Sequence, residues 1–134
     1  MYQGGCLCGA IGFVITGPIR NIVYCHCSQC RKAQGSAYAT NGIVQSQHFT
    51  ITAGSDQLNA YESSPGQTRF ACRICSSPII SKNLSKPGQL RIRLGTIDSD
   101  ISEKPQAHIF VSSKASWDQI TDELPQYDSY EPER

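Results

Sequence analysis

Alternating apolar and polar positions mark short strands along this chain, and the clearest run reads "LRIRLG". Successive side chains of a β-strand point to opposite faces of its sheet. Leu90, Ile92 and Leu94 would therefore share one face. Arg91 and Arg93 would share the other. We expect the apolar face to pack in the core and the arginine face to meet solvent or a ligand.

Further runs rich in β-branched and aromatic residues predict more strands, at 11–16, 21–25, 36–44, 48–52, 68–72 and 108–111. Gly, Pro, Asn or Ser residues separate these runs, as is typical of turns between strands. Many short strands with frequent turns predict a mainly β fold class built from antiparallel sheets.

Helix signals are short and weak. In "SQCRKAQG", Ser28 is a candidate N-cap and Gly35 a candidate stop. A second helical segment is expected at 113–124, ended by Pro125, with Trp117 as its packing anchor. We therefore expect short helical turns beside the sheets.

The chain of 134 residues is about one domain long, and no linker, repeat or low-complexity segment divides it. We expect a single domain over 1–126. The last residues are polar and punctuated by proline, so 127–134 is expected to form an extended or frayed C-terminal tail.

Charge and hydropathy limit the classes of partner. Charged residues make up 17% of the chain, the formal net charge is +1, and like charges form no block. Nucleic acid and membrane surfaces are therefore not expected as partners. The N-terminal residues show no signal-peptide pattern, and no run approaches the roughly 20 apolar residues that span a bilayer. We expect a cytoplasmic protein.

The seven cysteines fall into three groups, which are Cys6 and Cys8, then Cys25, Cys27 and Cys30, and finally Cys72 and Cys75. Cytoplasmic thiols stay reduced, and an odd number of cysteines does not pair completely within one chain. Burial as small hydrophobic side chains would explain a single cysteine but not the grouping. Metal binding is therefore the better interpretation.

The first and last groups suit one structural zinc site. Residues two apart in an extended segment point the same way, so Cys6 and Cys8 can aim at one metal ion. A C-x-x-C turn brings Cys72 and Cys75 together in the same manner. Four thiolates complete the tetrahedron that zinc prefers. We therefore predict a closed, structural zinc site at these four cysteines.

The middle group contains three cysteines. Alternation places Cys25 and Cys27 on one side, and the turn that follows can bring Cys30 to join them. A zinc ion with three protein ligands keeps one coordination position open, as catalytic zinc does. We predict a second zinc here, which makes these three cysteines the candidate catalytic residues.

Alternatives stay open for this group of three. His26 lies between two of the cysteines but points away by alternation. His48 or His108 could arrive from a distant strand as a fourth ligand, and the site would then be closed. The three cysteines could also hold no metal and form a disulfide in a redox protein.

Several motifs together resemble the glutathione-dependent formaldehyde-activating enzyme family, from Gly5 to about Gln126. They are "GxCxCGA", "CHCSxCRK", "CxxC" followed by "SPI", "GTID", "HIF" and "SKASWDQITDELPQ". The resemblance implies a predominantly β, Mss4-like zinc fold. It also implies two Zn²⁺ ions per chain, a structural one on Cys6, Cys8, Cys72 and Cys75 and a catalytic one on Cys25, Cys27 and Cys30.

The chain departs from the family pattern at its second zinc knuckle. The family commonly reads F-C-x-x-C-G, whereas this chain reads "FACRICSS", with Phe70 one position earlier and Ser76 in place of glycine. Glycine after a knuckle often serves a backbone with positive φ, which serine adopts at some cost. We expect the departure to affect the geometry of the structural site.

The activity implied by the resemblance is that of a carbon–sulfur lyase acting on a thiol adduct such as S-hydroxymethylglutathione, which forms from formaldehyde and glutathione. An open zinc site suits this chemistry because it can bind a thiolate sulfur or polarise a carbonyl oxygen. The alternative is a non-catalytic, zinc-stapled binding module, since one fold hosts many functions. The expected partner is a small thiol, and the sequence indicates no oligomeric state.

Residues near the three cysteines supply further candidates. Arg31 and Lys32 would compensate negative charge or hold a substrate carboxylate, unless they form an ordinary solvated pair. Tyr24 and Tyr38 would donate a hydrogen bond near the metal or pack in the core. His108 would shuttle protons or sit as a hydrogen-bonded core histidine.

Overall fold

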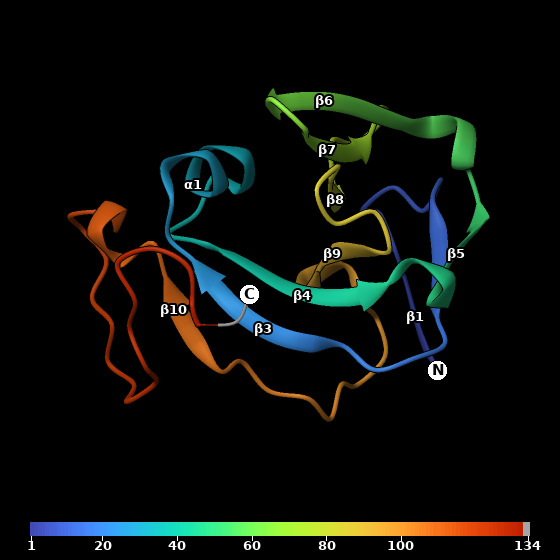
Figure 1. Ribbon diagram of the computed structural model, residues 1–134. Coiled ribbons are helices and arrows are strands. Elements are labelled where there is room, and N and C mark those ends of the chain that lie inside the picture. The colour runs from blue at the N-terminus through green and yellow to red at the C-terminus, as the bar shows by residue number, and fades with distance from the viewer. Residues whose placement is uncertain (133–134) are drawn as a thin grey trace.

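The computed structural model describes residues 1–132 and arranges them in two β-sheets (Figure 1). The smaller sheet has the order β1-β2-β5, with β1 (Tyr2–Gly5), β2 (Gly12–Ile15) and β5 (Phe49–Ala53). The larger sheet has the order β10-β3-β4-β9-β8-β7-β6. Its strands are β3 (Arg20–Cys25), β4 (Ala39–Gln45), β6 (Leu58–Ser64), β7 (Gln67–Cys72), β8 (Pro78–Asn83), β9 (Gln89–Arg93) and β10 (Ala107–Ile109). The mainly β fold class is confirmed.

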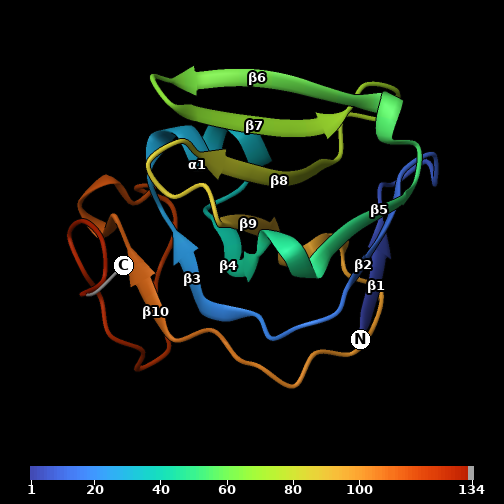
Figure 2. The same ribbon diagram turned by 45° about the vertical axis from the view of Figure 1, so that its right-hand side comes forward.

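The larger sheet is strongly curved. In both ribbon views β6 and β7 lie above β3 and β4, with β8 and β9 connecting the two levels (Figures 1 and 2). Neighbouring strands run antiparallel throughout both sheets except at the edge, where β10 pairs with β3 in parallel. The long connection before β10 carries the chain back along the sheet, and Glu103 fixes it by accepting a 2.9 Å hydrogen bond from the Ile19 backbone N–H.

The main hydrophobic core lies between the two sheets. Phe13 and Ile15 of the smaller sheet pack with Val44, Leu90 and Ile92 of the larger one, all buried. The alternation predicted for β9 is therefore correct, because its apolar side chains enter this core. Its arginines point to the opposite face of the sheet.

Three strands lack a clear sequence signal. β6 is largely exposed along its length, so it has no apolar face to produce alternation. β1 is four residues long and half glycine. β8 begins with Pro78, at the position where a strand best tolerates proline.

The first predicted helix is confirmed as α1 (Ser28–Gln34), and Gly35 ends it in a left-handed conformation with φ 62°. Its N-cap is Cys27 rather than Ser28, because the Cys27 Sγ accepts a 3.3 Å hydrogen bond from the Cys30 backbone N–H. The sulfur thus replaces the oxygen of a usual N-cap residue. The remaining helical turns are short 3-10 elements, η1 (Ser46–His48), η2 (Ser55–Gln57), η3 (Leu94–Thr96) and η4 (Val111–Ser113).

The second predicted helix, at 113–124, is wrong. After η4 the chain forms turns, and Trp117 is 71% exposed rather than a packing anchor. A polar side chain of this segment makes hydrogen bonds that do not belong to a helix. Asp122 accepts hydrogen bonds from the ring of His108 and from the Leu124 N–H. Side chains that find such partners favour turns over helix.

The C-terminal segment lies along β10. The His108 backbone donates to the Pro125 carbonyl and accepts from the Tyr127 N–H, each at 2.9 Å. The predicted tail, 127–134, therefore begins as an extended segment beside β10, and residues 133–134 lie outside the described residues. No helix within the described chain is long and apolar enough to span a membrane.

Candidate metal centres and active site

Four cysteines meet where the loop after β1 approaches the turn between β7 and β8. The sulfur atoms of Cys6, Cys8, Cys72 and Cys75 all lie within 4.8 Å of one another. Backbone N–H groups point at two of them, from Ile11 to the Cys6 sulfur at 3.2 Å and from Ile74 to the Cys72 sulfur at 3.4 Å. This arrangement, here called the four-cysteine cluster, offers the donor set of a closed zinc site.

The turn at Cys72 and Cys75 has the geometry of a zinc knuckle. The Ser76 N–H donates to the Cys72 carbonyl at 2.8 Å, and the Cys72 N–H donates to the Ser77 carbonyl at 2.9 Å. Ser76 has φ 68°, the conformation expected where the family carries glycine. Hydrogen bonds from Ser77 lower the pKa of the Cys75 thiol to about 5, which favours the thiolate that a metal requires.

The other three cysteines meet at the junction of β3 and α1. Cys25 ends β3, Cys27 caps α1 and Cys30 lies in the first helical turn, with their sulfur atoms within 4.8 Å of one another. Cys25 and Cys30 are buried and Cys27 is half-buried. We call this arrangement the three-cysteine cluster.

The protonation of this cluster is uneven. Hydrogen bonds with Cys25 and Cys27, together with the Arg69 guanidinium, lower the pKa of Cys30 to about 2. Hydrogen bonds with Cys27 and Cys30, together with burial, raise the pKa of Cys25. All seven cysteines are free thiols in the structure.

No histidine within residues 1–132 joins the three sulfurs. His26 is fully buried and points away from them, as alternation predicts, with its Nε2 2.9 Å from the Nδ1 of His108. The Nε2 of His108 in turn contacts the Asp122 carboxylate at 2.9 Å. His48 lies in η1, where its backbone carbonyl accepts from the Thr16 N–H.

A hydrogen-bonded chain runs from the buried His26 through the buried His108 to the exposed Asp122. His108 is thus a hydrogen-bonded core histidine, and burial holds the pKa of His26 below its ordinary value. The rings of Tyr24 and Tyr38 meet edge to face, with centres 4.7 Å apart, and each also contacts one of these histidine rings. Neither tyrosine is among the described residues that line the cavity beside the cluster.

That cavity has a volume of about 390 Å³, within the usual range for small-molecule sites. Its wall contains the three cysteines and residues from the strands of the larger sheet. Arg69, Arg91 and Arg93 all face it. The Arg69 Nη2 lies 3.7 Å from the Cys30 Sγ. The prediction that the arginine face of β9 meets solvent or a ligand is consistent with this cavity.

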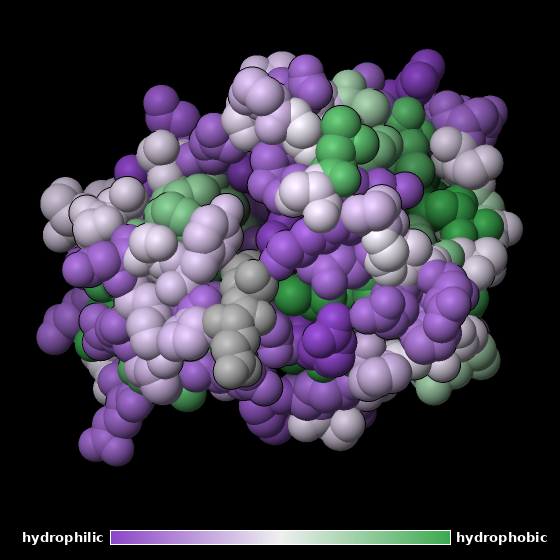
Figure 3. Space-filling model, in the orientation of Figure 1, coloured by the Kyte–Doolittle hydropathy of each residue, from purple (hydrophilic) through white to green (hydrophobic). Residues whose placement is uncertain are grey.

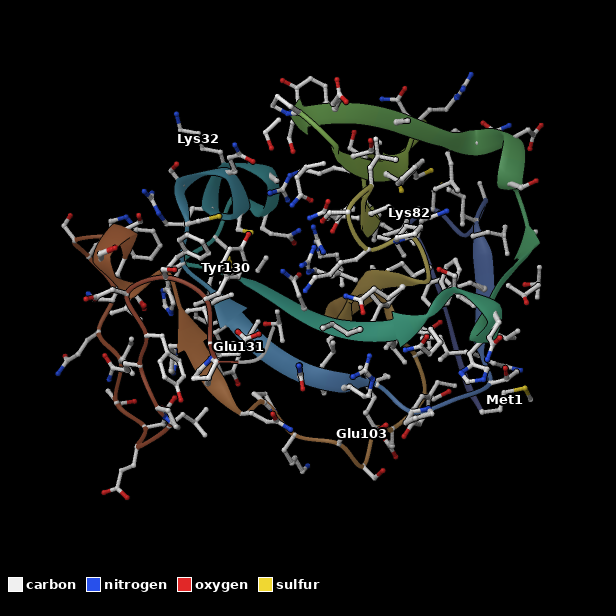
Figure 4. The ribbon with its side chains drawn as sticks, viewed as in Figure 1. Met1, Lys32, Lys82, Glu103, Tyr130 and Glu131 are labelled. Carbon is white, nitrogen blue, oxygen red and sulfur yellow. The ribbon has the colours of Figure 1, made fainter. Side chains whose placement is uncertain are left out.

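The basic residues that follow the cluster in sequence do not line the cavity. Figure 4 shows Lys32 pointing outward from α1, whereas Tyr130 lies between α1 and β3 and contributes to the cavity wall. Arg31 is half-buried elsewhere on the helix. Sequence reasoning missed Arg69 and Tyr130, since neither stands in a motif with the cysteines. Hydrophilic residues predominate on the face of the molecule that is turned toward the viewer in Figure 3.

Comparisons with known proteins identify the same family. The model of the family "glutathione-dependent formaldehyde-activating enzyme" matches residues 1–113. Two curated proteins that carry this family name are similar to the chain. The one from Podospora anserina is 27% identical over 122 residues, or 84% of this chain and 56% of that protein. The one from Talaromyces marneffei is 30% identical over 92 residues, or 66% of this chain and 49% of that protein.

The chain thus spans about half the length of these curated relatives. Among solved structures, a crystal structure of a Rhodobacter sphaeroides protein matches with a TM-score of 0.63 and 18% identity, covering 75% of this chain and 91% of that one. At that identity the match shows a shared fold alone. With a family model matching residues 1–113, the chain belongs to the glutathione-dependent formaldehyde-activating enzyme family.

Proposed function

We propose that this protein is a zinc-dependent carbon–sulfur lyase that acts on the adduct of formaldehyde with a small thiol, such as S-hydroxymethylglutathione. One observation carries the proposal. Three cysteine sulfurs gather on the wall of a cavity of about 390 Å³, with no fourth cysteine or histidine among the described residues to complete the group. The family name supports glutathione and formaldehyde as the reactants.

The two clusters fit two zinc ions with different roles. The four-cysteine cluster has the ligand number of a structural zinc, and the three-cysteine cluster that of a zinc with one open position. Zinc bound at three thiolates supplies a site that binds sulfur or polarises a carbonyl oxygen. We therefore assign Cys6, Cys8, Cys72 and Cys75 to the structural ion and Cys25, Cys27 and Cys30 to the catalytic one.

The reaction requires one carbon–sulfur bond to break or form. In the adduct R–S–CH₂–OH, the sulfur leaves with the bonding electron pair as thiolate, the hydroxyl proton passes to water, and formaldehyde is released. The cavity holds the adduct with its sulfur toward the three cysteines. The Arg69 guanidinium, 3.7 Å from the Cys30 sulfur, stabilises negative charge at this end of the cavity.

A rate measurement tests the proposal. Because the adduct forms spontaneously, exchange NMR should compare wild type with Cys27→Ser at equal concentration and at full zinc loading of wild type. We expect wild type to accelerate the exchange above the uncatalysed rate and Cys27→Ser to lose the acceleration. Serine is itself a good N-cap, so this variant retains the start of α1.

Lys32→Ala is the matched control, because Lys32 lies on the same helix but points away from the cavity. It should retain the wild-type rate. Equal rates for wild type and Cys27→Ser, with both zinc ions bound in wild type, would contradict the formaldehyde reaction and favour a zinc-stapled binding module.

A further inference from the structure

The larger sheet contributes a row of basic side chains to the cavity wall. In the sheet, Arg69 of β7 pairs with Ser81 of β8, and Ser81 pairs with Arg91 of β9. Residues that pair across neighbouring strands share one face. Arg93 stands two positions after Arg91 and so lies on the same face, where it also pairs with Asn41 of β4. The register of the strands therefore gathers the arginines in one place.

Two of these arginines have buried donor groups that residues 1–132 leave unpaired. Arg93 is 5% exposed, and its Nη1 donates a 3.3 Å hydrogen bond to Ser81, but its buried Nε has no hydrogen-bond partner among the described residues. Likewise, Nη1 of Arg69 is buried and unpaired within residues 1–132. A buried donor without an acceptor costs free energy. A ligand that supplies acceptor oxygens would remove this cost.

The positive charge of the side chains around the cavity also favours binding of an anion. The described residues that line it include three arginines and no aspartate or glutamate. Three thiolates with one divalent zinc carry a formal charge of about −1. Arg69 and Arg93 alone exceed that charge. Burial lowers the pKa of Arg93 to about 10.

We propose that Arg69 and Arg93 form a subsite for a carboxylate, so that the enzyme selects small thiols that carry an acidic group. This inference rests on the proposed function, in which the sulfur of the substrate faces the three cysteines. Because Arg69 Nη2 lies 3.7 Å from Cys30 Sγ, a carboxylate bound by Arg69 would lie close to a sulfur held at the three cysteines. Guanidinium groups suit this role because their planar fork matches the two oxygens of a carboxylate.

The test compares two thiols of equal chain length that differ in charge, β-mercaptopropionate and its methyl ester. Calorimetric titration of the zinc-loaded protein should show that the acid binds on the order of tenfold more tightly than the ester. In Arg93→Gln the preference should disappear while the affinity for the ester stays unchanged. Arg20→Gln, which removes an exposed guanidinium outside the cavity, should keep the wild-type preference.

A second measurement uses wild type and so does not depend on the folding of a variant. Propionate has the carboxylate but no sulfur, and its addition should shift the NMR signal of the Arg93 Nε–H group. Arg69→Gln provides a further variant at a partly exposed position, with the same expected loss of preference as Arg93→Gln.

The outcomes separate the two proposals. Equal affinity of wild type for acid and ester, or a preference that survives in both arginine variants, would overturn the carboxylate subsite while leaving the lyase function intact. No shift of the Arg93 signal with propionate would also overturn it. A propionate-induced shift without binding of either thiol would support the subsite and contradict the role of the three cysteines in binding sulfur.

Discussion

The two cysteine clusters place the same side chain in different parts of the fold. The four-cysteine cluster joins segments far apart in sequence, since Cys8 and Cys72 are separated by 64 positions and their sulfurs by 3.8 Å. The three-cysteine cluster is local, because all its members lie between Cys25 and Cys30. A metal in the first cluster therefore cross-links the two sheets, whereas a metal in the second closes only a short turn.

The surroundings of the two clusters also differ. The three-cysteine cluster lies on the wall of a cavity with arginines, while no member of the four-cysteine cluster lines that cavity. The number of thiols and the space they face thus separate a candidate structural site from a candidate catalytic one. Four predictions test or refine this contrast.

The largest difference is expected in thermal stability. Cys72→Ser should lower Tm by about 10 °C or more, because binding of a structural zinc is coupled to folding. Cys27→Ser should change Tm little, since serine keeps the N-cap and the cluster joins no distant segments. Differential scanning calorimetry of both variants would measure this. Equal losses would mean that the three-cysteine cluster is structural as well.

The second difference concerns metal retention. Purified under reducing conditions and supplied with zinc, the protein should bind two zinc ions per chain, and a chelator should remove the ion with three ligands first. Elemental analysis during stepwise chelation would follow both ions. In Cys27→Ser only the tightly held ion should remain. A wild-type value that stays at one after zinc addition would exclude the open site.

A smaller effect is expected at the knuckle of the four-cysteine cluster. Ser76 has φ 68°, so Ser76→Gly should relieve strain and raise the free energy of unfolding by about 0.5 to 1 kcal/mol. Chemical denaturation of the zinc-loaded protein would detect this change. Ser76→Ala keeps a side chain at the same φ and serves as the control. A gain of equal size in Ser76→Ala would show that backbone strain is not the cause.

The smallest effect concerns the hydrogen-bonded chain of His26, His108 and Asp122. The hydrogen bond between Asp122 and His108 holds the pKa of the Asp122 carboxyl below its ordinary value. A lowered pKa means that the carboxylate stabilises the fold above the ordinary aspartate pKa and that this contribution is lost as pH falls through the lowered value. An NMR titration of the Asp122 carboxyl should show the low pKa in wild type and a return upward in His108→Gln. An unchanged value in the variant would remove His108 as the cause.

Much of this molecule follows from local patterns in the chain. Alternation in "LRIRLG" predicted the core face and the arginine face of β9, because the period of a strand is a local property. The spacings of the cysteines likewise predicted which sulfurs would meet. The prediction of a second helix was wrong because the structure of that segment depends on a contact that is not local. Asp122 contacts His108, which lies on a strand 14 positions earlier in the chain.

The sequence alone therefore determined the mainly β class and the division of the seven cysteines between two clusters. Only the tertiary structure decided what the three-cysteine cluster faces. Arg69 contacts Cys30, which is 39 positions away in the sequence, and His26 contacts His108, which is 82 positions away. These contacts depend on the order of strands in the larger sheet, on their register and on the curvature that brings β7 over β3. Such features result from the packing of the whole chain, so a local spacing rule does not encode them.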